Sequence, residues 1–177
     1  MTRHPRFPDQ LARSDRRMFL AAGLAALGLP RIAQAQLAGR PMLKITAPDG
    51  TVTELDEEGF ARLPWHEVTT HTRWTDGPQQ FRGPLLRDVL ELAGAGEGVL
   101  QGRELRMTAM NEFQVDIPAS DAWDFRPILA REMNGRTMRI RDKGPIWLIY
   151  PRDDIAALQN PVIDERWIWQ LVDITVI

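Results

Sequence analysis

One buried strand near the C-terminal end constrains the fold of this 177-residue chain more than any other feature. Residues 146–150 are an unbroken run of β-branched, aliphatic and aromatic side chains between two prolines, which predicts a short strand buried on both faces. A Gly144-Pro145 turn precedes it, and Arg141, Asp142 and Lys143 bring three charges to that turn. Such a strand can hold polar groups at the rim of a pocket, although a structural strand behind a solvated hairpin has the same pattern.

The first 35 residues have the pattern of an export signal. Adjacent arginines at positions 16 and 17 precede an apolar run over residues 19–29, and Ala33-Gln34-Ala35 is a small-x-small cleavage site. The apolar run is shorter than the roughly 20 residues that a membrane-spanning helix needs. We therefore expect a twin-arginine signal peptide over residues 1–35. The mature protein would be a periplasmic domain over residues 36–177 that is not embedded in the membrane.

The composition of residues 36–177 excludes several classes of protein. Sixteen Lys and Arg against twenty-two Asp and Glu give a net charge of −6, so we expect no nucleic-acid partner. The chain has no cysteine, which removes thiolate nucleophiles, thiolate metal ligands and iron–sulfur clusters. His66 and His71 lie five residues apart on an extended segment and are expected on opposite faces, so they cannot share one metal ion. Ser120 lacks a nucleophile-elbow context and is expected to cap the turn before Asp121.

Short strands alternate with few helices along the rest of the chain. We expect strands over residues 42–46, 51–55, 65–74, 104–110, 114–117, 138–141, 146–150 and 167–176. We expect short helices over residues 57–63, capped by Asp56, from Gly83-Pro84 to Ala93, and around 127–133. Many strands with few, short helices predict an α+β fold with mixed β-sheets.

Three residues of the extended segment form a candidate ligand face. Thr70, Thr72 and Trp74 share one face because side chains alternate along a strand. Two hydroxyls and an indole on one face would suit a flat heteroaromatic ligand. A threonine-rich strand with one core tryptophan explains the same spacing equally well.

Four blocks of sequence occur in an order that resembles a known family. They are residues 70–74 (THTRW), 81–90 (FRGPLLRDVL), 110–113 (MNEF) and 141–151 (RDKGPIWLIYP). This order resembles the molybdopterin-binding domain of the sulfite oxidase superfamily, over about residues 41–177. The resemblance implies a sulfite-oxidase-like molybdopterin-binding fold. The size and export signal look most like its small, single-domain periplasmic branch, which includes proteins that bind reduced pterins and report to a membrane sensor.

Two departures from the family pattern bear on the chemistry. Catalytic members ligate molybdenum through a cysteine thiolate in the region that here is residues 69–74, where this chain offers threonine hydroxyls and no cysteine. A hydroxyl is a far poorer ligand than a thiolate for such a metal. The usual Asn-Asp-Tyr appears as Asn111-Glu112-Phe113, which keeps the amide and a carboxylate but loses the phenol. The resemblance therefore implies a pterin pocket without the molybdenum-ligating cysteine.

The hydrogen-bonding edge of a pterin suggests roles for three polar residues. Its 2-amino and N3–H groups donate two hydrogen bonds, which the carboxylate of Glu112 or Asp121 would accept. The side-chain amide of Asn111 would donate to and accept from the remaining edge atoms.

The ring face and the oxygen atoms of a pterin suggest roles for five more residues. Trp74, Trp147 or Tyr150 would stack on the ring, and Arg141 and Lys143 would donate to its carbonyl or side-chain oxygens. A charged hairpin tip explains the two cations, and core packing explains Trp147, without any ligand. The candidate cofactor-binding residues are Thr70, Thr72, Trp74, Asn111, Glu112, Asp121, Arg141, Lys143, Trp147 and Tyr150.

The leading hypothesis is a periplasmic pterin-binding protein without redox activity, whose cofactor is a reduced or molybdopterin-like pterin without molybdenum. It would relay pterin occupancy to a membrane sensor, either a sensor kinase or a cyclic-dinucleotide enzyme. One alternative is a molybdopterin-dependent oxidoreductase that lacks a cysteine ligand. Another is an interaction module that binds no ligand.

Overall fold

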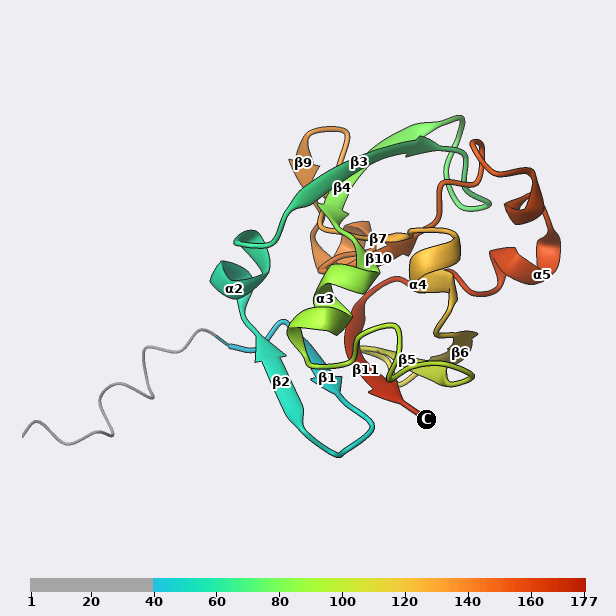
Figure 1. The fold of residues 1–177 in the computed structure, drawn as a ribbon. Helices are drawn as coiled ribbons and strands as arrows, with labels where there is room; N and C mark the ends of the chain where they lie inside the picture. Colours follow the sequence, from blue (N-terminus) through green and yellow to red (C-terminus); the bar gives the residue numbers. More distant parts are fainter. Residues whose placement is uncertain (1–39) are drawn as a thin grey trace, which may run out of the picture.

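The computed structural model describes residues 40–177, so the expected signal peptide lies outside the described part. The described chain is α+β, as predicted, with mixed sheets and short helices (Figure 1). The strands are β1 (Leu43–Thr46), β2 (Val52–Leu55), β3 (Trp65–Thr70), β4 (Gln79–Pro84), β5 (Glu104–Ala109), β6 (Gln114–Pro118), β7 (Ile128–Ala130), β8 (Glu132–Met133), β9 (Arg136–Thr137), β10 (Trp147–Ile149) and β11 (Leu171–Val176). The helices are α2 (Glu57–Ala61), α3 (Leu86–Leu92), α4 (Asp121–Asp124) and α5 (Pro161–Asp164), with 3₁₀ turns η1 (Ile140–Asp142) and η2 (Ala156–Leu158).

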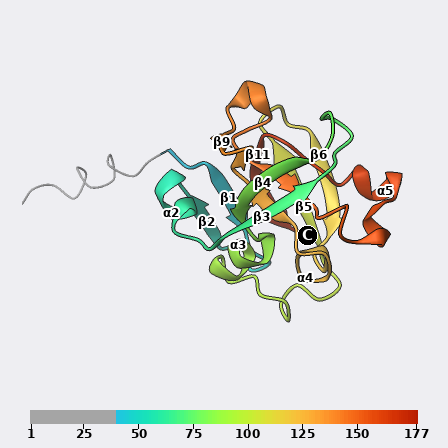
Figure 2. The ribbon, with the colours of Figure 1, turned by 90° about the horizontal axis from the view of Figure 1, so that it is seen from above.

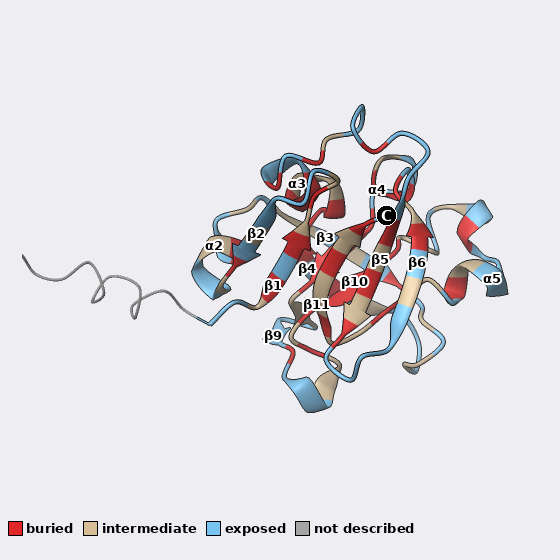
Figure 3. Ribbon diagram, turned by 90° about the horizontal axis from the view of Figure 1, so that it is seen from below, coloured by how far each residue is buried: buried red, intermediate tan, exposed pale blue. Residues whose placement is uncertain are grey.

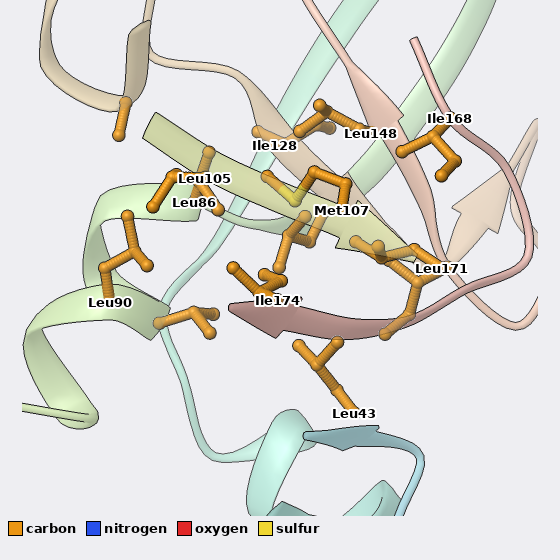
Figure 4. Close-up of a cluster of buried hydrophobic side chains, with 14 of the residues drawn as sticks. Leu43, Leu86, Leu90, Leu105, Met107, Ile128, Leu148, Ile168, Leu171 and Ile174 are labelled. Carbon is orange, nitrogen blue, oxygen red and sulfur yellow. The ribbon is translucent and has the colours of Figure 1, made fainter. Parts of the chain in front are cut away.

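A five-stranded sheet in the order β2-β1-β11-β5-β6 forms one side of the molecule. Strand β1 pairs with β11 in parallel, and the other neighbours are antiparallel. Alternate residues of β1 and β5 are buried, and Figure 3 colours them red, because successive strand residues point to opposite faces. Figure 4 shows Leu43, Met107 and Ile174 of this sheet meeting in one apolar cluster.

A four-stranded sheet in the order β3-β4-β8-β9 lies on the opposite side (Figures 1 and 2). The β7–β10 pair lies between the two sheets (Figure 1). Strand β10 is buried on both faces, and residues 146–150 all have 0% exposure. The sequence prediction of a buried strand here is confirmed. Residues 128–130 on β7 are equally buried and pair with β10 in antiparallel register.

Short helices connect the strands of these layers. Asp56 caps α2 as expected, because its carboxylate Oδ1 accepts a hydrogen bond of 2.8 Å from the backbone N–H of Gly59. Helix α3 buries Leu86, Val89 and Leu90 against the core. Among residues 40–177, no helix has the length and apolar character needed to cross a bilayer.

Two sequence predictions were wrong because partner strands override local preference. The segment expected to be helical around residues 127–133 forms β7 and β8, since pairing with β4 and β10 buries its apolar side chains on both faces. Gly83 and Pro84 end strand β4 instead of opening a helix, which begins at Leu86.

Three other boundaries differ from the sequence predictions. Residues 140–142 form the 3₁₀ turn η1 instead of a strand over 138–141. The extended segment from Trp65 ends at Thr70, and the last strand begins at Leu171. Ser120 stands at the N-cap position of α4, but its side chain makes no capping hydrogen bond.

Gly83 allows β4 and β7 to approach closely, which gives a test of the central packing. A Cβ at this position would meet the backbone carbonyl of Leu129 and would lie 2.9 Å from the Cα of Ala130. We expect Gly83→Ala to lower the free energy of unfolding by about 2–3 kcal/mol, measured by urea denaturation. Gly96→Ala is the matched control, because a Cβ there meets nothing within 4 Å. Equal midpoints for the two variants would contradict the close approach.

Candidate functional site

A pocket of about 510 Å³ opens beside the β5–β6 hairpin. Three chain segments build it: the hairpin itself, the residues between α5 and β11, and the loop that follows β3. Its lining consists of Trp74, Ala109, Asn111, Phe113, Val115, Glu165, Trp167, Ile168 and Trp169. The lining is therefore mainly aromatic and aliphatic, with one amide and one carboxylate.

Trp74 is the centre of the aromatic lining. Its ring centroid lies 5.2 Å from that of Trp169, nearly perpendicular to it, and 6.1 Å from that of Trp167. Behind them the buried ring of Trp147 stands edge-on to Trp74 at 6.1 Å and to Trp169 at 6.2 Å. Edge-to-face packing of this kind is favourable between aromatic rings and fixes their planes. The pocket thus presents flat apolar walls held by a packed ring beneath.

Three polar groups of the pocket can bond to a ligand. The side-chain Oδ1 of Asn111 accepts a hydrogen bond of 3.2 Å from the backbone N–H of Phe113, which orients the amide NH₂. Glu165 adds an exposed carboxylate. The indole Nε1–H of Trp167 is buried and has no acceptor among residues 40–177. Buried donors in proteins are usually paired, so this N–H is a candidate donor to a bound molecule.

The loop that carries Trp74 is held by the two threonines that were expected to contact the ligand. The Thr72 hydroxyl accepts a hydrogen bond from the backbone N–H of Trp74 at 3.1 Å and contacts the Thr75 hydroxyl at 2.9 Å. The buried Thr70 hydroxyl accepts a hydrogen bond from the backbone N–H of Asp153 at 3.2 Å. Neither threonine lines the pocket. Their side chains position the loop instead of the ligand.

A pairing of His71 with Asp153 closes the same loop. The backbone N–H and the ring Nδ1 of His71 lie 2.9 and 2.7 Å from the same Oδ2 of Asp153. Partial burial acts to raise the pKa of Asp153, but hydrogen bonds from His71 outweigh it, so this pKa lies below its usual value. The loop is thereby tied to the chain that follows β10.

Beneath the pocket, three residues form a buried polar network. Both carboxylate oxygens of Asp121 accept hydrogen bonds from Arg166 Nη1, at 2.8 and 2.7 Å, and Oδ2 also accepts one from the Tyr150 hydroxyl at 2.8 Å. Complete burial, and secondly the Asp121 charge, raise the pKa of Tyr150 well above its ordinary value. The Trp167 ring lies over Tyr150 at 5.9 Å. Asp121 and Tyr150 therefore support the pocket from below and do not line it.

The charged residues of the predicted site lie outside the pocket. The Lys143 ammonium stands 4.5 Å from the ring centroid of Trp169 and 5.4 Å from that of Trp147, which is a cation–π arrangement. The Arg141 side chain is exposed on η1, and Glu112 is exposed with a positive φ in the β5–β6 turn. The pocket lining includes none of Lys143, Arg141, Glu112 and Trp147.

Of the ten predicted site residues, the structure brings Trp74 and Asn111 to the pocket. Sequence reasoning missed Phe113, Glu165, Trp167 and Trp169, which also line it. A signal for two of them was present, because the Trp-Ile-Trp order of residues 167–169 places both indoles on one face of an extended segment. Within residues 40–177, no three His, Cys, Asp or Glu side chains are grouped so that they would hold a metal ion.

Comparisons with known proteins give a family and a similar fold. Residues 54–155 match the family model described as the oxidoreductase molybdopterin binding domain. The sulfane dehydrogenase SoxCD from Paracoccus pantotrophus is similar in structure, with 17% sequence identity and a TM-score of 0.59. The match covers 76% of this chain and 37% of that one. No protein with a curated description matches the sequence.

The network under the pocket should stabilise the fold. Asp121 is 2% exposed, so Arg166→Met would leave its carboxylate buried without a cationic partner. We expect a loss of about 3 kcal/mol in the free energy of unfolding, measured by urea denaturation. The matched control is Arg106→Met, which breaks an exposed bidentate pair with Asp116 and should have little effect. A loss no larger than that of the control would contradict the role of the network.

The His71–Asp153 pairing predicts a pH dependence. Because the pKa of Asp153 is lower in the folded state, its stabilising contribution is complete above about pH 4 and is lost as the pH falls through the folded-state pKa. Wild type should thus have a higher urea midpoint than Asp153→Asn at pH 7, and the two midpoints should converge towards pH 3. Asp154→Asn changes the neighbouring exposed carboxylate and should show no such pH-dependent difference. A constant gap for Asp153→Asn would contradict the pairing.

Proposed function

The chain belongs to the oxidoreductase molybdopterin-binding domain family, and from this premise we propose that it binds a pterin ring without redox chemistry and relays occupancy to a membrane sensor. The expected signal peptide supports a periplasmic location for this relay. Export in the folded state by the twin-arginine route would allow the domain to take up a cytoplasmic pterin first. Descent from a cofactor-bearing ancestor would explain the same route.

One observation carries the binding proposal: three tryptophans wall the pocket, and one of them, Trp167, has a buried indole N–H without an acceptor among residues 40–177. Its volume of about 510 Å³ falls within the range of roughly 300–1,000 Å³ that is usual for small-molecule sites. Flat aromatic walls suit a planar heteroaromatic ring. The unpaired N–H of Trp167 suits a ligand with a ring nitrogen or carbonyl acceptor.

The polar groups at the pocket match the edge of a pterin. Glu165 would accept hydrogen bonds from the 2-amino and N3–H groups, the role that sequence analysis gave to Glu112 or Asp121. The amide NH₂ of Asn111 would donate to a ring nitrogen or carbonyl. Trp74 and Trp169 would contact the ring faces.

The donor set fits the pterin better than it fits a metal. A bound molybdenum centre would supply redox chemistry. The pocket offers an amide, a carboxylate and indoles, and the chain has no cysteine thiolate to bind such a metal. The family match favours a molybdopterin-dependent oxidoreductase. We rank it as the second candidate because the chain lacks a thiolate ligand. A module that binds no ligand is the third.

Analysis of the natively exported protein separates these candidates. The protein would be purified from the periplasm and denatured, and the released small molecules would be oxidised and assayed for pterin fluorescence. Molybdenum would be measured by elemental analysis. Near-stoichiometric pterin without metal supports the proposal, and molybdenum together with pterin overturns it in favour of the oxidoreductase. If neither is found and added tetrahydrobiopterin does not bind in a titration, the interaction module replaces it.

Substitution of Trp167 tests the site directly. Trp167→Phe keeps an aromatic ring and removes the N–H, so we expect about tenfold weaker tetrahydrobiopterin binding, equivalent to one lost hydrogen bond of about 1.4 kcal/mol. Titration by tryptophan fluorescence would measure the affinity, and thermal unfolding would verify folding. Trp65→Phe is the matched control, because it also removes a buried unpaired N–H but lies outside the pocket. Unchanged affinity in a folded Trp167→Phe would exclude this N–H as a ligand donor.

A further inference from the structure

A short segment next to the pocket concentrates positive charge in an otherwise acidic chain. Residues 131–143 carry five Lys and Arg against two Asp and Glu. The rest of the described chain carries eleven cations against twenty anions. The segment includes β8, β9 and η1, and β9 is the outermost strand of its sheet. The segment therefore has a net charge of +3, and the rest of the described chain has a net charge of −9.

The exposed part of this segment, which we call the arginine lobe, consists of Arg136, Arg139, Ile140 and Arg141. The side chains of Arg139 and Arg141 are 66% and 71% exposed, and Ile140 is 55% exposed between them. Both arginines pair with the carboxylate of Asp142: Arg139 Nε lies 2.8 Å from Oδ2, and Arg141 Nε lies 3.7 Å from Oδ1. Arg136 has no ion pair among residues 40–177. The lobe thus has cationic groups in excess around an apolar residue.

Two grooves flank the lobe and share residues 137–139. One, of about 510 Å³, runs along Ile140 and Arg141, and the other, of about 860 Å³, runs along Arg136. Two adjoining grooves, one of them lined by the exposed Ile140, suit an extended polypeptide. They do not enclose a small anion, since the arginine heads at their rims are exposed.

The lobe is joined to the pocket wall by Gln170, the residue after Trp169. Its backbone N–H donates a hydrogen bond of 3.1 Å to the carbonyl of Lys143, and its side-chain Nε2 donates one of 2.9 Å to the carbonyl of Ile140. The Lys143 ammonium stands over the Trp169 ring, which lines the pocket. A shift of Trp169 on ligand binding would therefore act directly on η1.

We propose that the arginine lobe docks an acidic segment of a partner protein, with an apolar side chain against Ile140 and carboxylates on the arginines, and that pocket occupancy changes its affinity. The second part rests on the proposed function; the docking does not. Charge complementarity favours this occupant. A flat anionic membrane would attract the lobe but repel the more acidic remainder of the chain.

The test uses a fluorescein-labelled peptide of twelve residues with a central leucine among Asp and Glu, measured by fluorescence anisotropy. We expect binding to the wild-type protein that weakens as salt rises. Arg136→Glu/Arg139→Glu should weaken it at least about tenfold, because each reversal turns an attraction into a repulsion. Arg62→Glu/Arg103→Glu, the matched control, makes the same charge change on exposed residues outside the lobe and should change affinity much less.

Further arms identify the occupant. A peptide with Gln and Asn in place of the acids, or with glycine in place of leucine, should bind at least about fivefold more weakly. Absence of peptide binding, or equal loss in the control variant, would overturn the docking. So would pyrophosphate or phosphatidylglycerol vesicles that bind the lobe more tightly than the peptide does.

The coupling is measured separately by repeating the titration with saturating tetrahydrobiopterin. A change in peptide affinity of at least about fivefold is expected for coupled sites, while the double lobe variant should keep wild-type pterin affinity. Unchanged peptide affinity, with pterin bound, would overturn the coupling and leave the docking intact. If tetrahydrobiopterin does not bind the wild-type protein, the proposed function fails, and the pterin-free titration still decides the docking.

Discussion

Two tryptophan walls of the pocket, Trp167 and Trp169, depend on backbone pairing with one buried strand. The backbone N–H of Leu148 on β10 donates to the carbonyl of Ile168 at 2.9 Å, and the carbonyl of Ile146 accepts from the N–H of Leu171 at 3.0 Å. These bonds hold residues 167–169 as an extended segment alongside β10. Because Ile168 faces the strand's apolar surroundings, the tryptophans on either side of it are fixed where Trp74 packs against them. The buried strand β10 therefore sets the geometry of two tryptophan walls of the pocket.

The same segment is anchored at both ends by hydrogen bonds. At its start, Arg166 bonds to the buried carboxylate of Asp121, and at its end Gln170 bonds to the carbonyls of η1. The first anchor leads into the core and is rigid, because a buried carboxylate has no water to replace its partner. The second leads to an exposed turn with few packing contacts, where small movements cost little. A ligand that displaces Trp169 would thus be expected to move η1 and leave α4 in place.

Sequence patterns predicted the parts of this arrangement that depend on local chemistry. The buried run at residues 146–150, the Asp56 cap and the α+β class follow from hydrophobic pattern and capping rules, and the structure has them. Strand β7 was missed because its three residues carry no alternating pattern. Only its position between β4 and β10 makes it a strand. Long-range pairing of this kind leaves no local signal.

The residues of the candidate site were also predictable only in part. Trp74 and Asn111 lie in recognisable sequence blocks, and the structure places both on the lining of the pocket. Asp121, Tyr150 and Trp147 were assigned to the ligand because their side chains have suitable chemistry, but each is buried. Chemistry alone does not tell a residue that contacts a ligand from one that supports it. That distinction depends on depth, which a single sequence does not specify.

The threonines at and just after the end of β3 stand where the family resemblance would place a metal-ligating cysteine. The resemblance implies that catalytic relatives supply their metal ligand from the region that corresponds to residues 69–74. Here the hydroxyls of Thr70 and Thr72 accept hydrogen bonds from the backbone N–H groups of Asp153 and Trp74. Those bonds hold the loop that presents Trp74, so the positions serve the shape of the ring pocket. The tryptophans at 167 and 169 do not depend on these threonines, because pairing with β10 holds the segment before β11. A pocket built in this way would keep its affinity for the ring after the metal ligand is gone, which is the property that a pterin sensor requires.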